Sequence, residues 1–237
     1  MALPKVVLPT FELDLPSNGK TVKYRPFVVK EEKILLMALD TEDEFAITTA
    51  VKDLLKNCVQ SRIKIDNLPT FDLEYLFLNI RAVSVGEDVD MNITCKDDNK
   101  TEVKYTFSLF DVVVDKPEGH DPKIMLSDEM GIIFRYPSFK EFVQSSIIGK
   151  QLDPEGYIDI IAGCVDQLFD GEEVYDSSTT SKKEFKEFIE GLTTVQFKKV
   201  QEFFETLPKL EHKFKIINPE TGVESEYTIN GLQNFFG

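Results

Sequence analysis

The sequence predicts an α+β protein, with a mixed N-terminal domain over residues 1–116 and a mainly helical C-terminal domain over 123–237 that ends in a β-hairpin. Three observations support this fold class. Alternating apolar residues recur in pairs around turn residues, which is typical of hairpins. Apolar residues at helical spacing follow several capping-box patterns. Between the two parts, at 116–122, proline, glycine and charge replace the apolar pattern, which is typical of a boundary.

The N-terminal part begins with alternation and continues with helical periodicity. Its expected elements are a hairpin (11–15 and 21–25), two helices (30–37 and 41–61) and a short strand (63–65). On the second helix, apolar residues from Ile47 to Cys58 share one face. Cys58 is therefore expected to pack in the core as a small apolar residue.

The segment 68–87, LPTFDLEYLFLNIRAVSVGE, predicts a helix that is apolar on nearly every side and ends at Gly86. Such a helix is expected in a core or an interface. Arg81 lies within its apolar run and needs a partner, because a buried unpaired charge is costly. The candidate carboxylates are Glu74, Glu87, Glu31 and Glu32. Two interpretations stay open: an ion pair that specifies the fold, or a contact with a neighbouring subunit.

The remaining elements follow the same local signals, and no internal repeat is evident in the sequence. They are expected as a hairpin (89–95 and 103–109) extended at 112–114, two short strands (123–126 and 131–136), a helix capped by Ser138, three further helices (154–168, 181–192 and 193–208), and a final hairpin (213–217 and 223–229). Asp166, Asp170, Glu172, Glu173 and Asp176 surround Gly171 and are interpreted as a solvated loop, since they lack the spacing of a calcium loop.

Aromatic residues are the clearest candidates for partner contacts. The chain has 19 phenylalanines and no tryptophan. Phenylalanine at helical spacing usually packs in a core, but a small domain encloses few rings, and the surplus can anchor a partner. The interface candidates are Tyr75, Phe185, Phe188, Phe203, Phe204, Phe235 and Phe236.

The net charge of −15 argues against non-specific binding to nucleic acid and to anionic membrane surfaces. The acidity has two explanations: solubility, or a basic partner surface. No apolar run is long enough to span a membrane.

No pattern for catalysis, a cofactor or a metal is present. The nucleotide-binding, nucleophile-elbow and zinc-protease motifs are missing, and there are only two histidines. Cys58, Cys95 and Cys164 are too widely spaced for a zinc site. Their odd number fits a reducing cytosol better than a disulfide framework. Cys164 lies on the apolar face of its helix, so core packing is favoured over a nucleophilic role.

Several sequence features resemble the baseplate hub family of T-even-type contractile-tailed phages. They are Lys23-Tyr-Arg-Pro-Phe27, Lys30-Glu-Glu-Lys-Ile-Leu35, Leu68-Pro-x-Phe71, Glu74-Tyr-Leu-Phe-Leu78, Arg81-Ala-x-Ser84-x-Gly86-Glu87 and the closing GLQNFFG. The resemblance is strongest over residues 9–110. Some members have a cysteine-containing ribbon after the Gly-Glu motif, where this chain has only Cys95.

The resemblance implies a non-enzymatic component of the baseplate hub, with no cofactor and no catalytic residues. Its partners would be other tail baseplate proteins in a hetero-oligomeric assembly, built in the host cytoplasm and located in the virion tail. Two alternatives remain. One is a transient assembly factor for hub proteins that is absent from the mature virion, and the other is an enzyme of unknown chemistry.

Overall fold

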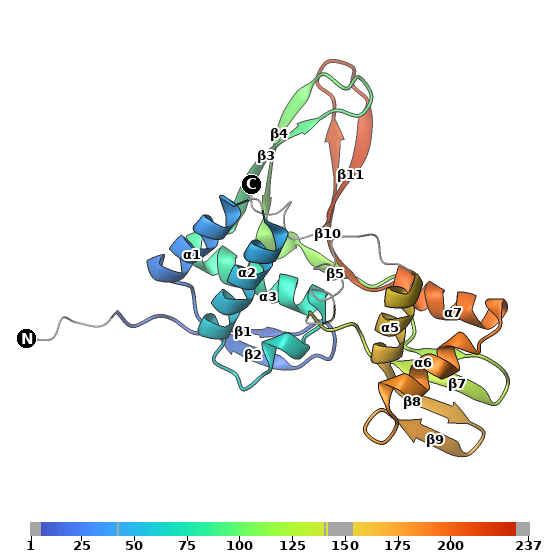
Figure 1. The fold of residues 1–237 in the computed structure, drawn as a ribbon. Coiled ribbons are helices and arrows are strands. Elements are labelled where there is room, and N and C mark those ends of the chain that lie inside the picture. The colour runs from blue at the N-terminus through green and yellow to red at the C-terminus, as the bar shows by residue number, and fades with distance from the viewer. Residues whose placement is uncertain (1–5, 42, 140, 142–153, 231–237) are drawn as a thin grey trace, which may run out of the picture. The chain divides into compact units, whose positions relative to one another are not determined.

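The structure is a computed structural model that describes residues 6–41, 43–139, 141 and 154–230. These residues form an α+β fold with six α-helices and 11 strands in four small sheets (Figure 1). The chain divides into two compact units. The first comprises residues 1–65, 71–115 and 209–237, and the second comprises 66–70 and 116–208.

The first unit combines a hairpin with three helices. Strand β1 (Phe11–Asp14) pairs antiparallel with β2 (Thr21–Tyr24), as the alternation predicts. The three helices are α1 (Val29–Leu39), α2 (Glu44–Cys58) and α3 (Thr70–Val85). Between α2 and α3 the chain forms a 3-10 helix, Ile65–Asn67, so the strand expected at 63–65 is wrong.

Helix α3 is the centre of this unit, because residues on every side of it are buried. Leu76, Phe77 and Ile80 are completely enclosed, as its all-round apolarity predicts. Asp72 is also fully buried, and its carboxylate accepts hydrogen bonds from the backbone and hydroxyl of Ser17 in the β1–β2 turn. These bonds tie the first turn of the helix to the hairpin.

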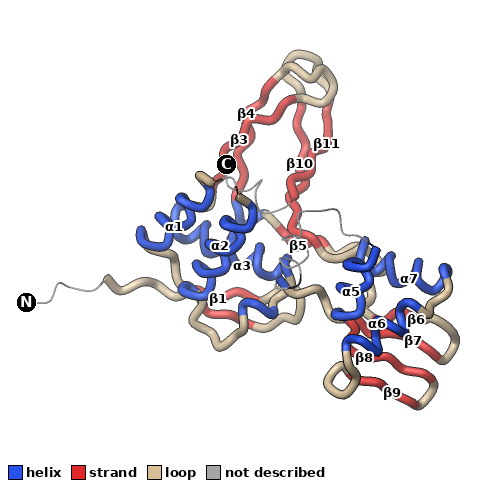
Figure 2. The backbone as a smooth tube through the Cα atoms, in the orientation of Figure 1, coloured by secondary structure: helices blue, strands red, loops and turns tan. Residues whose placement is uncertain are grey.

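Two hairpins extend side by side from the helices of the first unit (Figure 2). One pairs β3 (Asp88–Thr94) with β4 (Glu102–Ser108). The other pairs β10 (Lys209–Ile217) with β11 (Glu224–Asn230), and the other edge of β10 pairs with β5 (Val113–Asp115). Aromatic rings join them: Tyr105 stacks on Phe214 with centroids 4.0 Å apart. At the tips, the Lys96 backbone N–H donates to the Tyr227 hydroxyl at 2.8 Å.

The second unit has a four-stranded antiparallel sheet in the order β6-β7-β8-β9. Its strands are β6 (Lys123–Met125), β7 (Met130–Phe134), β8 (Val165–Asp170) and β9 (Glu173–Asp176), and its helices are α5 (Pro154–Cys164), α6 (Lys182–Glu190) and α7 (Thr194–Glu205). Ile132, Phe134, Ile161, Phe185 and Phe203 belong to its buried core.

The expectation of a mainly helical C-terminal region is wrong, because this sheet occupies much of it. The helix expected over 154–168 ends at Cys164, and the chain continues directly as strand β8. The acidic residues around Gly171 lie in the β8–β9 hairpin rather than in a loop, and Gly171 takes the positive φ of its turn. Most of the helix expected after Ser138 lies outside the described residues.

Local capping signals gave the correct starts of the last two helices. Ser181 with Glu184 begins α6, and Thr193 with Gln196 begins α7, each as a reciprocal capping box. The final hairpin also forms, with β10 and β11 in register from Glu211 opposite Asn230 to Ile217 opposite Glu224.

Candidate functional site

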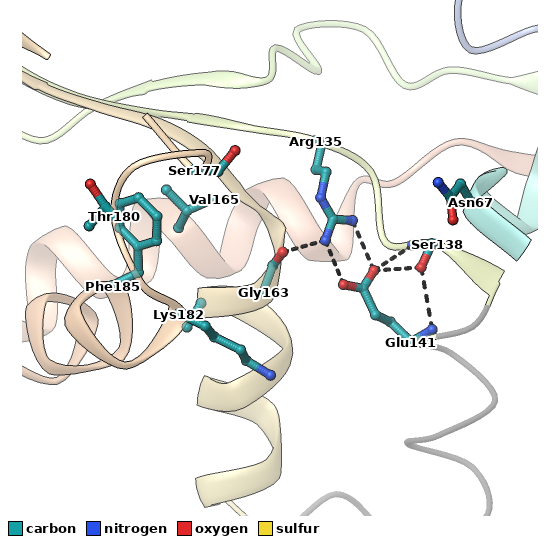
Figure 3. Close-up of a pocket in the computed structure, with 11 residues that line it drawn as sticks. Asn67, Arg135, Ser138, Glu141, Gly163, Val165, Ser177, Thr180, Lys182 and Phe185 are labelled. Atoms are coloured by element: carbon teal, nitrogen blue, oxygen red, sulfur yellow. Dashed lines mark hydrogen bonds and ion pairs between the residues drawn. The ribbon is translucent and has the colours of Figure 1, made fainter. Parts of the chain in front are cut away.

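A polar pocket of about 680 Å³ lies within the second unit (Figure 3). Its lining includes Arg135 and Ser138 from the segment after β7, Gly163 at the end of α5, and Lys182 at the start of α6. Glu141 completes the polar side, and its carboxylate faces the guanidinium of Arg135.

Arg135 and Glu141 form a two-pronged ion pair. The Nη1 atom of Arg135 is 2.9 Å from Oε2 of Glu141, and Nη2 is 2.5 Å from Oε1. Nη2 also donates to the Gly163 carbonyl. The backbone N–H and the hydroxyl of Ser138 each donate to Oε2 of Glu141 at 2.8 Å. The pair therefore holds the segment 135–141 against the end of α5.

The charge states of this pair suit a structural role. The Glu141 hydrogen bond raises the pKa of Arg135 above its usual range. Burial acts to raise the pKa of Glu141, but hydrogen bonds from Arg135 and Ser138 outweigh it and hold that pKa below its usual range. A general acid or base works best with a pKa near the operating pH. Both groups are shifted away from neutrality, so they are poorly suited to proton transfer.

Cys164, beside this pair, is also unsuited to chemistry. Its side chain is fully buried, and burial raises the pKa of its thiol to about 12. The thiolate is the reactive form, and little of it exists at neutral pH. In the part of the chain that the structure describes, no group of three or more His, Cys, Asp or Glu side chains is placed to hold a metal ion.

A second, more apolar pocket of about 340 Å³ lies between the sheet and α6. Leu168, Tyr175, Phe185 and Phe188 contribute apolar surface, and Asp170 and Glu184 contribute carboxylates. Phe188 is half-buried, and Tyr175 is 41% exposed.

The structure places the five ion-pair candidates in different surroundings. Arg81 and Glu74 are half-buried on α3, and burial lowers the pKa of Arg81. Glu87 is exposed just after that helix. Glu32 is half-buried on α1, whereas Glu31 is buried and pairs with Arg25, whose Nη2 is 2.7 Å from its Oε1.

The aromatic candidates divide into buried and partly exposed residues. Phe185 and Phe203 are buried in the core of the second unit. Phe188 and Phe204 pack against that core but remain half-buried, as does Tyr75 on α3. Phe235 and Phe236 lie outside the described residues.

Sequence reasoning missed the arginines that organise the two units, Arg25 and Arg135. Each follows a strand and precedes a glutamate by six residues. The glutamate also accepts a backbone N–H three residues earlier, from Val28 or Ser138, which is a recognisable capping signal. Asp72, the buried carboxylate of α3, is not among the candidates that the sequence indicates.

None of the described helices is long and apolar enough to cross a membrane. Searches of curated proteins and of solved structures find no match. The model of one protein family, described as T4 bacteriophage base plate protein, matches residues 8–237. That match spans nearly the whole chain, including both compact units. The chain therefore belongs to the T4 bacteriophage base plate protein family.

Proposed function

We propose that this protein is a non-enzymatic component of the baseplate hub that acts by binding other tail proteins in a hetero-oligomeric assembly. The observation that carries the proposal is the family match over residues 8–237, because a baseplate protein functions through contacts with its neighbours. The hub is the finer assignment, and it rests on the resemblance of the 68–87 segment to hub proteins.

The surface of α1 supports a role in protein contact. Four apolar side chains of this helix are exposed: Val29, Ile34, Leu36 and Met37. Val29 is 79% exposed and Met37 is 60% exposed. Where exposed apolar side chains join into one patch, that patch marks an interaction site on a folded protein. The net charge of −15 favours partners with basic surfaces.

Co-purification with the other baseplate proteins tests the proposal. We expect the tagged chain to hold a defined complex, and Leu36→Glu to weaken it without unfolding the protein, because Leu36 is exposed. Val195→Glu on α7 is the matched control, since Val195 is equally apolar and 73% exposed. A chain that binds no baseplate protein would refute the proposal.

Mass spectrometry of purified virions then separates the two roles within the proposal. A permanent hub subunit is present in mature particles at a fixed copy number. A transient assembly factor co-purifies with hub intermediates and is missing from finished particles.

A further inference from the structure

We infer that the two units contain two copies of one structural module, and that the part added to the second copy is a docking surface for a basic, apolar segment of another baseplate protein. The second half rests on the proposed function, whereas the first half does not.

Each unit has the same arginine–glutamate clasp. In the first, Arg25 binds Glu31 with Nη1–Oε2 at 3.1 Å and Nη2–Oε1 at 2.7 Å. In the second, Arg135 binds Glu141 with the same atom pairing at 2.9 and 2.5 Å. In both, the glutamate lies six residues after the arginine, and its Oε2 accepts a backbone N–H three residues before it at 2.8 Å.

The backbone partners of the two arginines also match. The Nη1 atom donates to the carbonyl of the next residue, Pro26 or Tyr136. The Nη2 atom donates to the residue before a buried cysteine, Asn57 or Gly163. The arginine backbone N–H donates to the carbonyl of that cysteine, Cys58 at 3.0 Å or Cys164 at 2.9 Å.

The surrounding strands correspond as well. The residue before each arginine is a buried aromatic that pairs antiparallel with the valine after the cysteine: Tyr24 with Val59, and Phe134 with Val165. Each aromatic ends the second strand of a hairpin, β2 or β7. Burial raises the thiol pKa of both cysteines, Cys58 and Cys164, to about 12.

So many matched bonds, made in the same order along the chain, are best explained by one module used twice. It consists of a hairpin, the clasp, and a helix that ends at the cysteine; in the first copy, α1 lies between the hairpin and that last helix. It covers residues 11–59 in the first unit and 123–165 in the second, apart from the residues that the structure does not describe. Sequence identity between the copies is confined to a few positions, which include Arg25 and Arg135, Glu31 and Glu141, and the Cys-Val pairs.

After the cysteine the copies differ. After the first copy, residues 60–69, all of which the structure describes, lead through a short 3-10 helix to α3. In the second, the chain extends strand β8, turns into β9 and adds the amphipathic helix α6. This added part supplies most of the lining of the 340 Å³ pocket.

The chemistry of the added part identifies the occupant. Phe188 and Tyr175 offer partly exposed rings to this pocket. Asp170 and Glu184 line the same pocket, Glu172 is exposed in the hairpin turn, and Glu173 is exposed at the start of β9. The complementary ligand is a bulky apolar side chain flanked by lysine or arginine.

Hydrogen–deuterium exchange on the full chain tests the shared module. Arg25→Met should speed amide exchange at least tenfold around residues 22–28 and 57–61, and Arg135→Met around 132–138 and 162–168, each leaving the other copy unchanged. Lys23→Met, on an exposed neighbour, is the control. Where a methionine variant does not fold, Arg→Lys gives a milder form of the same pattern, because lysine cannot form the fork.

The duplication is overturned if either clasp can be removed without faster exchange in its own copy. It is also overturned if an experimental structure shows the two hairpin–clasp–cysteine segments with different backbone paths.

Binding of a defined probe tests the docking surface. A labelled peptide with a central phenylalanine flanked by lysines should bind the full chain in an anisotropy titration, and the same peptide with glutamates should not. Phe188→Ala and Asp170→Lys should each weaken binding at least tenfold, with Val195→Ala as the control. Absence of binding, or equal binding by all variants, overturns this half.

Co-purification distinguishes this failure from failure of the proposed function. If Phe188→Ala leaves the peptide affinity and the complex with baseplate proteins intact, the docking surface is wrong and the proposed function stands. If the unaltered chain forms no such complex, the proposed function fails by itself, and the exchange test of the module is unaffected.

Discussion

Arg25 has more partners than a surface arginine normally has. Its guanidinium donates to Glu31 and to the carbonyls of Pro26 and Asn57, and the side chains of the ion pair are 20% and 10% exposed. Removing one member of a buried pair leaves the other charged and poorly solvated. We predict that Arg25→Ala lowers the free energy of unfolding by about 3 kcal/mol, measured by urea titration.

A double variant separates the energy of the Arg25–Glu31 ion pair from the effect of shortening the Arg25 side chain. Glu31→Gln in the Arg25→Ala background should add less destabilisation than Glu31→Gln alone, because the carboxylate is then already without its guanidinium. Lys23→Ala, which removes an exposed pair with Glu12, should change stability little. Strictly additive effects of Arg25→Ala and Glu31→Gln would contradict the clasp.

Glu31 also makes stability depend on pH. The hydrogen bond from Arg25 lowers the pKa of this carboxyl in the folded state. A group whose folded pKa is depressed contributes stability above its unfolded pKa, and that contribution is lost as the pH falls through the folded pKa. We predict that stability falls below about pH 4.3, the ordinary glutamate value, and falls less steeply in Glu31→Gln. Urea midpoints between pH 7 and pH 3 measure this, and equal slopes would contradict it.

At the scale of single residues, the sequence shows which charged residues lie in apolar surroundings, but it does not show which residues contact each other in the fold. Arg81 stands out because its neighbours in sequence are apolar, and the structure does place it half-buried. Arg25 and Arg135 follow short strands and look ordinary. Their role depends on carbonyls at Asn57 and Gly163, which are distant in sequence. Such contacts are set by the tertiary fold and leave no local pattern.

Strand β7 depends on a glycine for its close contact with its neighbours. A Cβ atom built on Gly131 would lie 2.4 Å from Cζ of Phe169 and 2.9 Å from the Ile124 carbonyl oxygen. The carbonyl belongs to the backbone of β6, so the sheet itself must shift. We predict that Gly131→Ala costs about 2 kcal/mol of stability, in the range of overpacked cores, with the loss measured by thermal or urea unfolding.

Gly163 near the end of α5 is the matched control. A Cβ there meets no atom closer than 3.4 Å, at Oε1 of Glu141. Gly163→Ala should therefore be neutral or stabilise by up to about 1 kcal/mol, because alanine reduces the freedom of the unfolded chain. The explanation fails if both variants lose the same stability.

Elements with clear start and stop signals in the sequence were predicted correctly, whereas the helix expected over 154–168, which has no stop signal at Cys164, was not. The hairpins around Gly19 and residues 96–100, and the capped helices α6 and α7, carry these signals locally. The run from Pro154 to Leu168 carries no breaker at Cys164, so its apolar residues fit a helix as well as a strand. Residues 165–170 form a strand because β8 pairs with β7 and β9, and the sequence of that segment alone does not show this pairing.

At the scale of the whole molecule, the order of elements along the chain does not show which elements belong to the same compact unit. The last hairpin, β10–β11, is separated from β5 by residues 116–208, yet it belongs to the same unit and pairs with β5. A sequence read from one end to the other assigns this hairpin to the part that precedes it. Long-range pairing of this kind follows from the tertiary fold, and the likeness of the two modules is also evident only from tertiary contacts.

The second unit is in effect an insertion within the first. Lys209 is paired with Asp115, and most of the second unit lies between them. Antiparallel partners have Cα atoms about 5 Å apart, which a two-residue Asn-Gly turn can bridge. We predict that joining Asp115 to Lys209 through Asn-Gly gives a protein that folds alone.

The expected product unfolds cooperatively in urea and keeps slow amide exchange in α3 and in the β10–β11 hairpin, at rates close to those of the full chain. Amide exchange should become faster at residues 66–70. The deletion removes Phe139, whose backbone N–H donates to the Leu68 carbonyl. A product with no cooperative transition would show that the first unit needs the inserted part to fold. Slow exchange in α3 would instead show that its enclosed side chains Leu76, Phe77 and Ile80 form a core independent of the insertion.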